Sequence, residues 1–286
     1  MFPGLALFVW GRSKYYDATT FSPPGGDIEM PNPGVLRRLH RLSRQGDRRH
    51  IFVALDHSFS TGPITSATEF DRLLRAVDAA NADAVILHRG RAKTTVPAAS
   101  GLGLILHVSG STSLGLSADE KVAVGCVEDA LRLGADALSV HLNVGSATES
   151  EQLRQIGALA GACDRWQVPL LIMSYPRGPG IVDEYDPDIV AHAVSVAVDL
   201  GADLVKTYFT GSVETMREVV ATSPVPVLAA GGRGEVGLTA DQFAQDVSDS
   251  GCAGIAMGRQ IFQNPAPGEV VRTLVQRIHG GVAVPI

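Results

Sequence analysis

From residue 50 onward, short runs of apolar and β-branched residues alternate with longer stretches whose apolar positions recur at helical spacing. Runs that are apolar almost throughout are typical of strands buried on both faces, as in a parallel sheet covered by helices. Eight such strand–helix units in succession favour closure into a TIM (β/α)8 barrel over an open sheet. The predicted strands are His50–Asp56, Ala82–His88, Gly103–Ser109, Ala137–Asn143, Pro169–Tyr175, Ala202–Tyr208, Pro226–Gly232 and Ala253–Gly258.

Several of these strands are preceded by similar short sequences, and this similarity supports a repeated strand–helix unit. Gly or Asn suits the end of a helix, where a residue of positive φ is needed, and Pro suits the first position of a strand. The second unit is weaker, because residues 89–100 predict no helix. The entry segments that resemble one another are Asn81–Ala84, Gly134–Ala137 and Gly201–Leu204.

The repeat predicts a barrel domain over residues 34–286 of the 286-residue chain, preceded by an arm over residues 1–33. The arm is rich in aromatic residues, proline and glycine, so little regular structure is expected in it. Pro3 and Gly4 interrupt its apolar run, and its cations follow that run. The arm therefore fits neither a signal peptide nor a membrane anchor.

Composition narrows the classes of partner. The chain is 45% hydrophobic and 19% charged, as in ordinary globular proteins. Its net charge of −6 disfavours nucleic acid as a partner, and no membrane partner is expected. The three cysteines, Cys126, Cys163 and Cys252, have no CxxC spacing, which indicates a reduced, cytoplasmic protein.

Polar residues gather at the predicted strand ends, where such barrels carry their chemistry. Lys206 is the most informative, because it interrupts an apolar strand, whereas the other three lysines are expected in the arm (Lys14), a loop (Lys93) and a helix (Lys121). Burial disfavours the ammonium form of a lysine and so yields a neutral amine nucleophile. The alternative is a structural lysine that is ion-paired with a carboxylate such as Asp56.

Asp56 and Tyr175 end the first and fifth predicted strands, so both should reach the same rim as Lys206. Taken alone, Asp56 would be interpreted as a helix cap and Tyr175 as a packed ring. Four histidines also end strands, and because they come from different strands their spacing cannot test metal ligation. A metal hydrolase is therefore an open alternative. These histidines are His57, His88, His107 and His141.

Glycines follow the last two predicted strands. Barrels commonly hold phosphate at this position, on backbone N–H groups and the beginning of a short helix. Glycine allows the backbone to come close to the phosphate oxygens, although paired glycines could also serve only to make tight turns. The candidate phosphate-binding residues are Gly231, Gly232, Gly258 and Arg259.

Seven motifs in order along the chain resemble the archaeal-type class I aldolases. This group includes archaeal fructose-bisphosphate aldolases and aminoheptulosonate synthases, and the text around His141 and Lys206 is more similar to the aminoheptulosonate branch. Arg89 stands where many relatives are expected to have Lys. The motifs are Ala54–Ser58, Leu87–Gly90, Ser139–Ser146, Tyr175–Gly178, Val205–Thr207, Ala230–Gly232 and Gly258–Gln263.

The resemblance implies a catalytic role for three residues: Lys206 as the Schiff-base lysine, Tyr175 as proton donor and acceptor, and Asp56 as the partner of Tyr175. It implies a phosphorylated ketone donor, dihydroxyacetone phosphate or a ketose phosphate, no cofactor, no metal and a homo-oligomer. Among aldehydes we favour L-aspartate semialdehyde, which would yield an amino-keto-heptanoate precursor of an aromatic compound. The further residues expected to bind substrate are His57, His141, Asn143 and Arg177.

His141 and Asn143 alternate along one strand, so they share a face and could meet the aldehyde beside Arg177. Equally, they could hydrogen-bond only to each other within a polar layer. The closest alternative function is a class I fructose-1,6-bisphosphate aldolase. More distant alternatives are an FMN-binding barrel oxidoreductase, which uses a phosphate site at the same position, and a ligand-binding barrel without catalysis.

Overall fold

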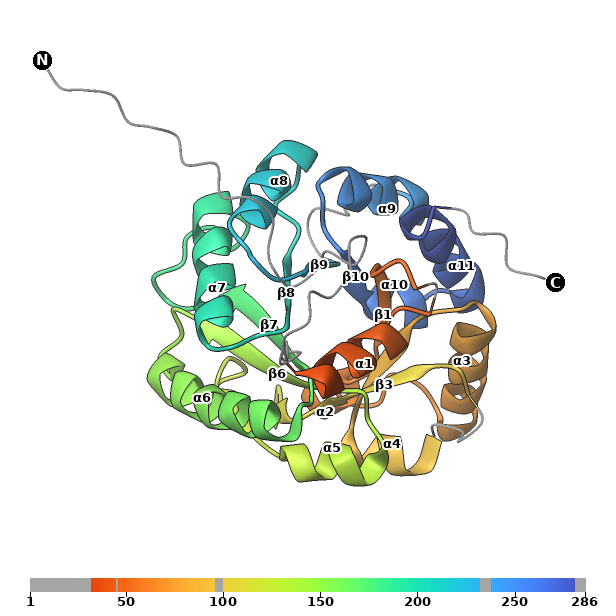
Figure 1. Cartoon of the computed structure of the whole chain (residues 1–286), viewed down its shortest axis with the longest axis horizontal. Helices are drawn as coiled ribbons and strands as arrows, with labels where there is room; N and C mark the ends of the chain where they lie inside the picture. The colour runs from red at the N-terminus through yellow and green to blue at the C-terminus, as the bar shows by residue number, and fades with distance from the viewer. Residues whose placement is uncertain (1–31, 45, 96–99, 232–237, 281–286) are drawn as a thin grey trace, which may run out of the picture. The chain divides into compact units, whose positions relative to one another are not determined.

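The computed structural model describes residues 32–44, 46–95, 100–231 and 238–280. Eight parallel strands close into a barrel in the order β1-β10-β9-β8-β7-β6-β3-β2, and helices surround it (Figure 1). The predicted TIM barrel is therefore confirmed. Its strands are β1 (His50–Ala54), β2 (Ala84–His88), β3 (Gly103–His107), β6 (Ala137–Val144), β7 (Leu170–Pro176), β8 (Leu204–Tyr208), β9 (Val227–Ala230) and β10 (Gly254–Met257).

Helices connect successive strands, and α1 precedes the first. A short antiparallel pair, β4 (Ser109–Gly110) and β5 (Val122–Ala123), lies between β3 and β6. No helix in the described ranges is long and apolar enough to cross a membrane. The helices are α1 (Pro33–Arg41), α2 (His57–Thr61), α3 (Ala67–Ala79), α4 (Arg89–Thr95), α5 (Val127–Leu133), α6 (Glu149–Trp166), α7 (Pro187–Asp199), α8 (Val213–Ala221), α9 (Ala240–Asp249), α10 (Arg259–Phe262) and α11 (Pro267–Ile278).

The prediction of no helix after the second strand was wrong, because α4 begins at Arg89, directly after β2. The helix is seven residues long and has no apolar stripe; among its residues with described side chains only Ala92 is buried. Periodicity could not reveal so short a helix. Lys93 consequently lies on a helix, and not in a loop as expected.

Side chains alternate along the strands between two apolar layers. One layer packs between the barrel and its helices, and it includes Val53, Val205 and Ile255. The other layer fills the barrel interior, where Phe52 of β1, Leu204 of β8 and Ile105 of β3 belong to one cluster. Each strand is covered on both faces, which explains why its sequence is apolar at almost every position.

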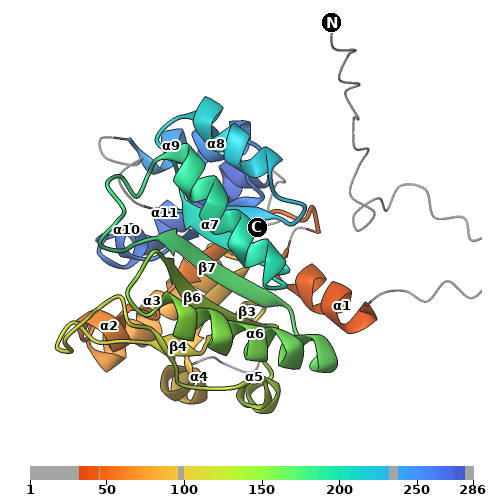
Figure 2. The same cartoon turned by 90° about the vertical axis from the view of Figure 1, so that its left-hand side faces the viewer.

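Helix α1 closes the amino-terminal end of the barrel. Its buried residues Val35 and Leu39 join the interior cluster. Arg38 donates to the carbonyl of Ala135 at 2.8 Å, which ties the helix to the chain just before β6. Figure 2 shows α1 at one end of the barrel and α2 and α10 at the other. Most of the predicted arm lies outside the described residues.

A buried ion-pair network holds the end of α11 against the same amino-terminal end. His279 lies 3.0 Å from Asp83 through Nε2 and 2.9 Å from Asp47 through Nδ1. Asp83 is fully buried and also accepts the backbone N–H of Ile51 at 2.6 Å. Burial lowers the pKa of His279, but the two carboxylates outweigh it and raise the pKa above its usual value.

The raised pKa predicts how stability depends on pH. The protonated His279 stabilises the fold fully below the ordinary histidine pKa, about 6.5, and this contribution is lost as pH rises through the folded-state pKa. We expect His279→Gln to lower the free energy of unfolding by about 1–3 kcal/mol at pH 6 and by less at pH 9. Urea unfolding at both pH values measures this, with exposed His40→Gln as control. An equal loss at both pH values would contradict the assignment.

Candidate active site

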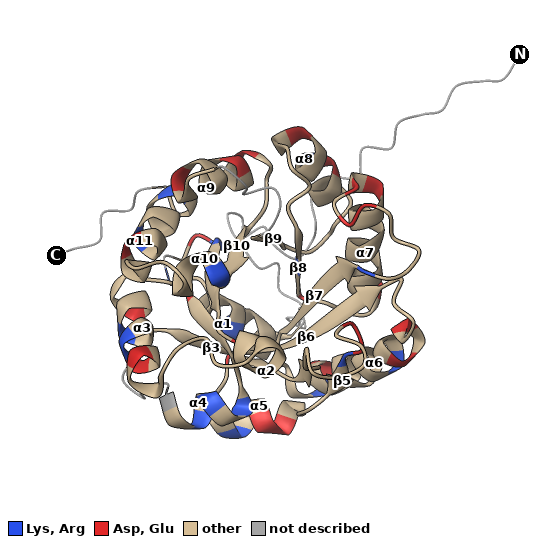
Figure 3. Ribbon diagram, turned by 180° about the vertical axis from the view of Figure 1, so that it is seen from behind, with Lys and Arg blue, Asp and Glu red and all other residues tan. Residues whose placement is uncertain are grey.

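A cavity of about 560 Å³ lies at the carboxyl ends of the barrel strands, a size typical of small-molecule sites. Figure 3 views the barrel from this end, with α2 and α10 in the foreground. Most of the residues predicted from the sequence converge here, although they come from six of the strands. Those that line the cavity are Asp56, His57, His141, Tyr175, Arg177, Lys206, Gly231, Gly258 and Arg259.

Lys206 lies in the barrel interior. It shares a face of β8 with Leu204 and Tyr208, which stand two residues before and after it and both belong to the interior cluster. In register it stands between Met173 of β7 and Leu228 of β9. Its exposed fraction is 7%, and no ion pair or hydrogen bond of its amine is found among the described residues. A purely structural lysine would require an ion pair with a carboxylate such as Asp56, and no such pair is found among the described residues.

The electrostatic surroundings favour a neutral amine at Lys206. Burial lowers the pKa of Lys206; Asp56 opposes this, and the nearby Arg177 and Arg259 add to the lowering. A lysine with a lowered pKa carries a larger fraction of free amine at neutral pH. Such an amine can attack a carbonyl carbon.

Asp56 follows β1 and stands at the beginning of α2, but its side chain does not cap the helix. Its Oδ1 is buried and has no hydrogen-bond partner among the described residues, and His57 Nδ1 is 3.6 Å away. Burial would raise the pKa of Asp56, but His107, His57 and Lys206 outweigh it and lower the pKa to about 2. The cavity therefore contains a carboxylate with an unused acceptor oxygen.

Tyr175 is buried on β7, and its ring lies among other aromatic rings of the cavity wall. Ring centroids are 5.0 Å away for His141 and 4.6 Å for Tyr208. Burial raises the pKa of Tyr175 well above its usual value, although Arg177 opposes the change. The phenol thus keeps its proton at neutral pH and can donate it.

Arg177 lies over this aromatic group and is held by Tyr208, a residue that the sequence analysis did not select. Its Nε donates to the Tyr208 hydroxyl at 2.8 Å, and Nη2 donates to the same oxygen. Glu184 lies 3.7 Å from Nε. Tyr208 could have been identified from its position two residues after Lys206, because alternate residues of a strand share a face.

Asn143 does not line the cavity. It is fully buried, and it shares a face with His141 as predicted, because His141 Nε2 lies 2.8 Å from Asn143 Oδ1. The Asn143 amide donates to the carbonyl of Asp119 at 2.8 Å, so Nε2 of His141 is the donor in their bond. Asn143 therefore orients His141 and the loop that contains Asp119, instead of facing a ligand.

Position 258 requires glycine because the backbone there comes close to Ala54 and His57, and not because of its backbone conformation. A Cβ atom there would lie 2.3 Å from the Ala54 carbonyl oxygen and 2.6 Å from the His57 ring. The missing side chain lets the start of α10 approach β1 and brings Arg259 to the cavity. Gly231 lines the cavity after β9, whereas Gly232 lies outside the described residues.

Two further cavity residues, Lys121 and His107, were named from the sequence but not predicted to belong to the site. Lys121 was expected on a helix, but it lies in the chain just before β5, lines the cavity and donates to Ser111 at 2.6 Å. Burial lowers the pKa of Lys121, and Arg177 adds to the lowering. His107 is buried beneath the carboxylate, with Nε2 3.9 Å from Asp56 Oδ2. Lys121 was missed because its position depends on how the whole loop between β3 and β6 folds.

Within the described ranges, no group of three or more His, Cys, Asp or Glu side chains is placed to hold a metal ion. The four strand-end histidines do not form such a group. His107 bonds to Ser139 at 2.9 Å and His141 to Asn143, so two of these imidazoles already have protein partners.

A lysine inside a (β/α)8 barrel, facing a carboxylate and a protonated tyrosine, defines a class I aldolase, which forms a Schiff base with its ketone substrate. The family model described as DeoC/LacD family aldolase matches residues 50–264. The chain belongs to this family and is an enzyme of the class I aldolase type.

Among curated proteins, a Streptomyces griseus 2-amino-4,5-dihydroxy-6-oxo-7-(phosphonooxy)heptanoate synthase is 46% identical over 253 residues, covering 87% of this chain and 92% of the relative. A Halobacterium salinarum 2-amino-3,7-dideoxy-D-threo-hept-6-ulosonate synthase is 38% identical over 250 residues, covering 87% and 93%. The resemblance noted from the motifs is thereby confirmed.

Among solved structures, an archaeal fructose 1,6-bisphosphate aldolase is 31% identical with a TM-score of 0.77, covering 86% of this chain and 100% of that one. Another archaeal fructose-1,6-bisphosphate aldolase is 30% identical with a TM-score of 0.76, covering 86% and 100%. In that structure the catalytic lysine is covalently bound to the carbinolamine intermediate of the substrate.

The position of Tyr175 predicts a large kinetic effect of removing its hydroxyl. We expect Tyr175→Phe to reduce turnover by about 10²–10⁴-fold, the usual contribution of a positioned proton donor. The control is Tyr185→Phe, whose ring stacks on Tyr208 at 4.8 Å but does not line the cavity. Steady-state kinetics of both variants measures the difference. Equal rates for Tyr175→Phe and the parent enzyme would mean that Tyr175 only packs.

Proposed function

We propose that this aldolase joins dihydroxyacetone phosphate, through a Schiff base on Lys206, to L-aspartate semialdehyde. The observation that carries the proposal is the buried Lys206 amine, which has no ion pair or hydrogen bond within the described ranges and shares one cavity with the Asp56 carboxylate. The name of the Streptomyces relative adds support, since it describes a phosphorylated amino-keto-heptanoate. A three-carbon ketone phosphate and a four-carbon amino-acid aldehyde together supply the seven carbons of such a product.

In the proposed reaction, the Lys206 amine attacks the ketone carbon and forms a carbinolamine. Tyr175, which burial keeps protonated, donates a proton to the hydroxyl that leaves as water, so that an iminium remains. The iminium acidifies the neighbouring carbon, and the Tyr175 phenolate left by the dehydration removes a proton from it to give an enamine. The same phenol then returns this proton to the aldehyde oxygen when the carbon–carbon bond forms. Asp56 stays ionised and accepts hydrogen bonds from the hydroxyl groups and from Tyr175. The enamine adds to the aldehyde carbon, and water then releases the product from Lys206.

The charges around the cavity suit an anion at each end of the reacting atoms. We propose that the phosphate binds at Gly231, Gly258 and Arg259, where α10 begins. Across the opening, Arg177 and Lys121 offer cationic donors for the carboxylate of the aldehyde. The neutral His141 ring already donates through Nε2 to Asn143, so its Nδ1 remains only as an acceptor, for a hydroxyl or the ammonium of the aldehyde.

The second candidate is cleavage of fructose 1,6-bisphosphate, favoured by the archaeal aldolases that share this fold at 30–31% identity. It uses the same lysine chemistry in the reverse direction and differs only in what occupies the Arg177 side of the cavity. Membership of an aldolase family argues against the FMN-dependent oxidoreductase and against a barrel without catalysis.

A condensation assay separates these candidates. We expect product from dihydroxyacetone phosphate with L-aspartate semialdehyde, measured by mass spectrometry, and turnover at least about 100-fold lower with unphosphorylated dihydroxyacetone, because binding of the remote phosphate positions the ketone. Efficient cleavage of fructose 1,6-bisphosphate without use of aspartate semialdehyde would replace the first candidate by the second. Equal turnover of dihydroxyacetone and its phosphate would contradict the phosphate site.

A further inference from the structure

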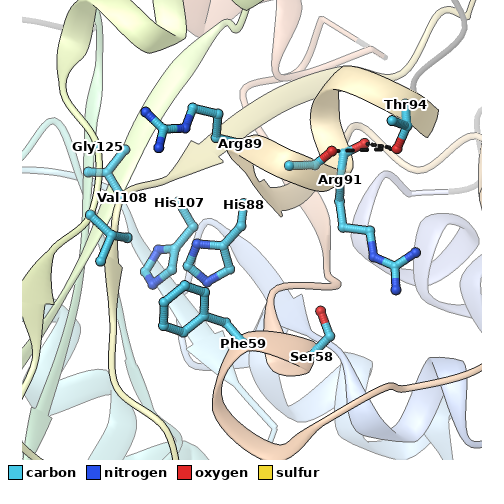
Figure 4. Close-up of a pocket in the computed structure, with 11 residues that line it drawn as sticks. Ser58, Phe59, His88, Arg89, Arg91, Thr94, His107, Val108 and Gly125 are labelled. Carbon is cyan, nitrogen blue, oxygen red and sulfur yellow. Dashed lines mark hydrogen bonds between the residues drawn. The ribbon is translucent and has the colours of Figure 1, made fainter.

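A second cavity, of about 600 Å³, opens beside the active site on the outer side of α2. We call it the side cavity; it lies between α2, the start of α4 and the end of β3. Figure 4 shows the imidazoles of His88 and His107 beside the Phe59 ring, with Arg89 and Arg91 extending on opposite sides. The active-site mechanism uses none of these side chains directly.

The lining of the side cavity is cationic. Two arginines line it, and no lining residue in the described part of the chain is acidic. Arg91 is held in place with its guanidinium 4.8 Å from the centre of the Phe70 ring. Figure 3 shows Lys and Arg on α4 and residues of both charges on α5, and the two helices pack against each other at this side of the barrel.

Arg89 combines a fixed position with unused donors. Its Nη1 lies 3.1 Å from Asp129, and Arg132 lies 2.6 Å from the other oxygen of the same carboxylate. Two cations thus share the Asp129 carboxylate, and Arg89 makes a single contact with it, through Nη1. The side chain of Arg89 is 51% exposed, and its remaining N–H groups have no partner among the described residues. A guanidinium held in this way is suited to a carboxylate.

The other wall is aromatic and accessible. Phe59 is 38% exposed, although its ring is positioned by His88 at 4.6 Å and by Gly110. A side chain at Gly110 would collide with this ring, since a Cβ atom there would lie 2.5 Å from Phe59 Cε1. The ring is therefore fixed yet leaves part of its surface to solvent. Exposed, rigid aromatic rings favour contact with flat apolar groups.

From these two walls we propose that the side cavity binds a planar aromatic carboxylate, with its carboxylate on Arg89 and its ring against Phe59 and His88. His107 borders both cavities and lies 3.9 Å from Asp56, so a ligand here is one side chain away from the catalytic carboxylate. The side cavity is then a binding site separate from the cavity that holds the substrates of the aldolase reaction.

Benzoate binding, measured by calorimetry with the full-length protein, tests the proposal. We expect benzoate to bind at least about tenfold more tightly than cyclohexanecarboxylate, which lacks the flat ring, and than benzyl alcohol, which lacks the charge. Inorganic phosphate should also bind more weakly. Equal affinity for phosphate or for cyclohexanecarboxylate would overturn the assignment of an aromatic ligand.

Two arginine variants provide a matched pair, because both lose an ion pair with Asp129 but only Arg89 lines the cavity. Arg89→Gln should weaken benzoate binding at least about tenfold, and Arg132→Gln by less than about threefold. Phe59→Leu, which keeps an apolar side chain, should also weaken it. Saturating dihydroxyacetone phosphate should leave benzoate bound. Displacement by this ketone, or equal losses in both arginine variants, would overturn the site, whether or not the protein catalyses the proposed condensation.

Discussion

The architecture of the site depends on placing one amine in the interior of an apolar barrel. Lys206 follows Leu204 on the inward face of β8 and stands on a layer that includes Phe52 and Leu171. Burying an ammonium among such residues is unfavourable, and the structure provides no ion pair to compensate it within the described ranges. The nearby arginines increase the penalty, so the neutral amine is favoured, as a nucleophile requires.

Asp56 is the counterpart of this lysine, and its state depends on its neighbours rather than on burial. The imidazoles of His57 and His107 lie within 4 Å of its two oxygens, and together with Lys206 they lower its pKa, although one oxygen has no hydrogen-bond partner among the described residues. An amine of lowered pKa, a carboxylate and a protonated phenol therefore lie in one cavity. Proton transfer among such groups is what a Schiff-base reaction needs at each step.

Much of the fold could be predicted from the sequence, because buried parallel strands are apolar at almost every position. Each predicted strand overlaps an observed one. Lys206 and Tyr175 could be selected because polar residues in such strands are conspicuous. The helix α4 and the loop position of Lys121 could not be predicted, since neither has a periodic pattern. Asn143 was predicted on the correct face, but only the fold of the loop at Asp119 determines that its amide is already used.

The central claim is that Lys206, and no other amine, forms the covalent intermediate, and borohydride reduction tests it most directly. Borohydride converts an iminium into a stable secondary amine, so the labelled lysine can be identified by peptide mass mapping. With dihydroxyacetone phosphate we expect an adduct on Lys206 alone, lost in Lys206→Arg and retained in Lys121→Arg. An adduct on Lys121, the other lysine of the same cavity, would contradict it.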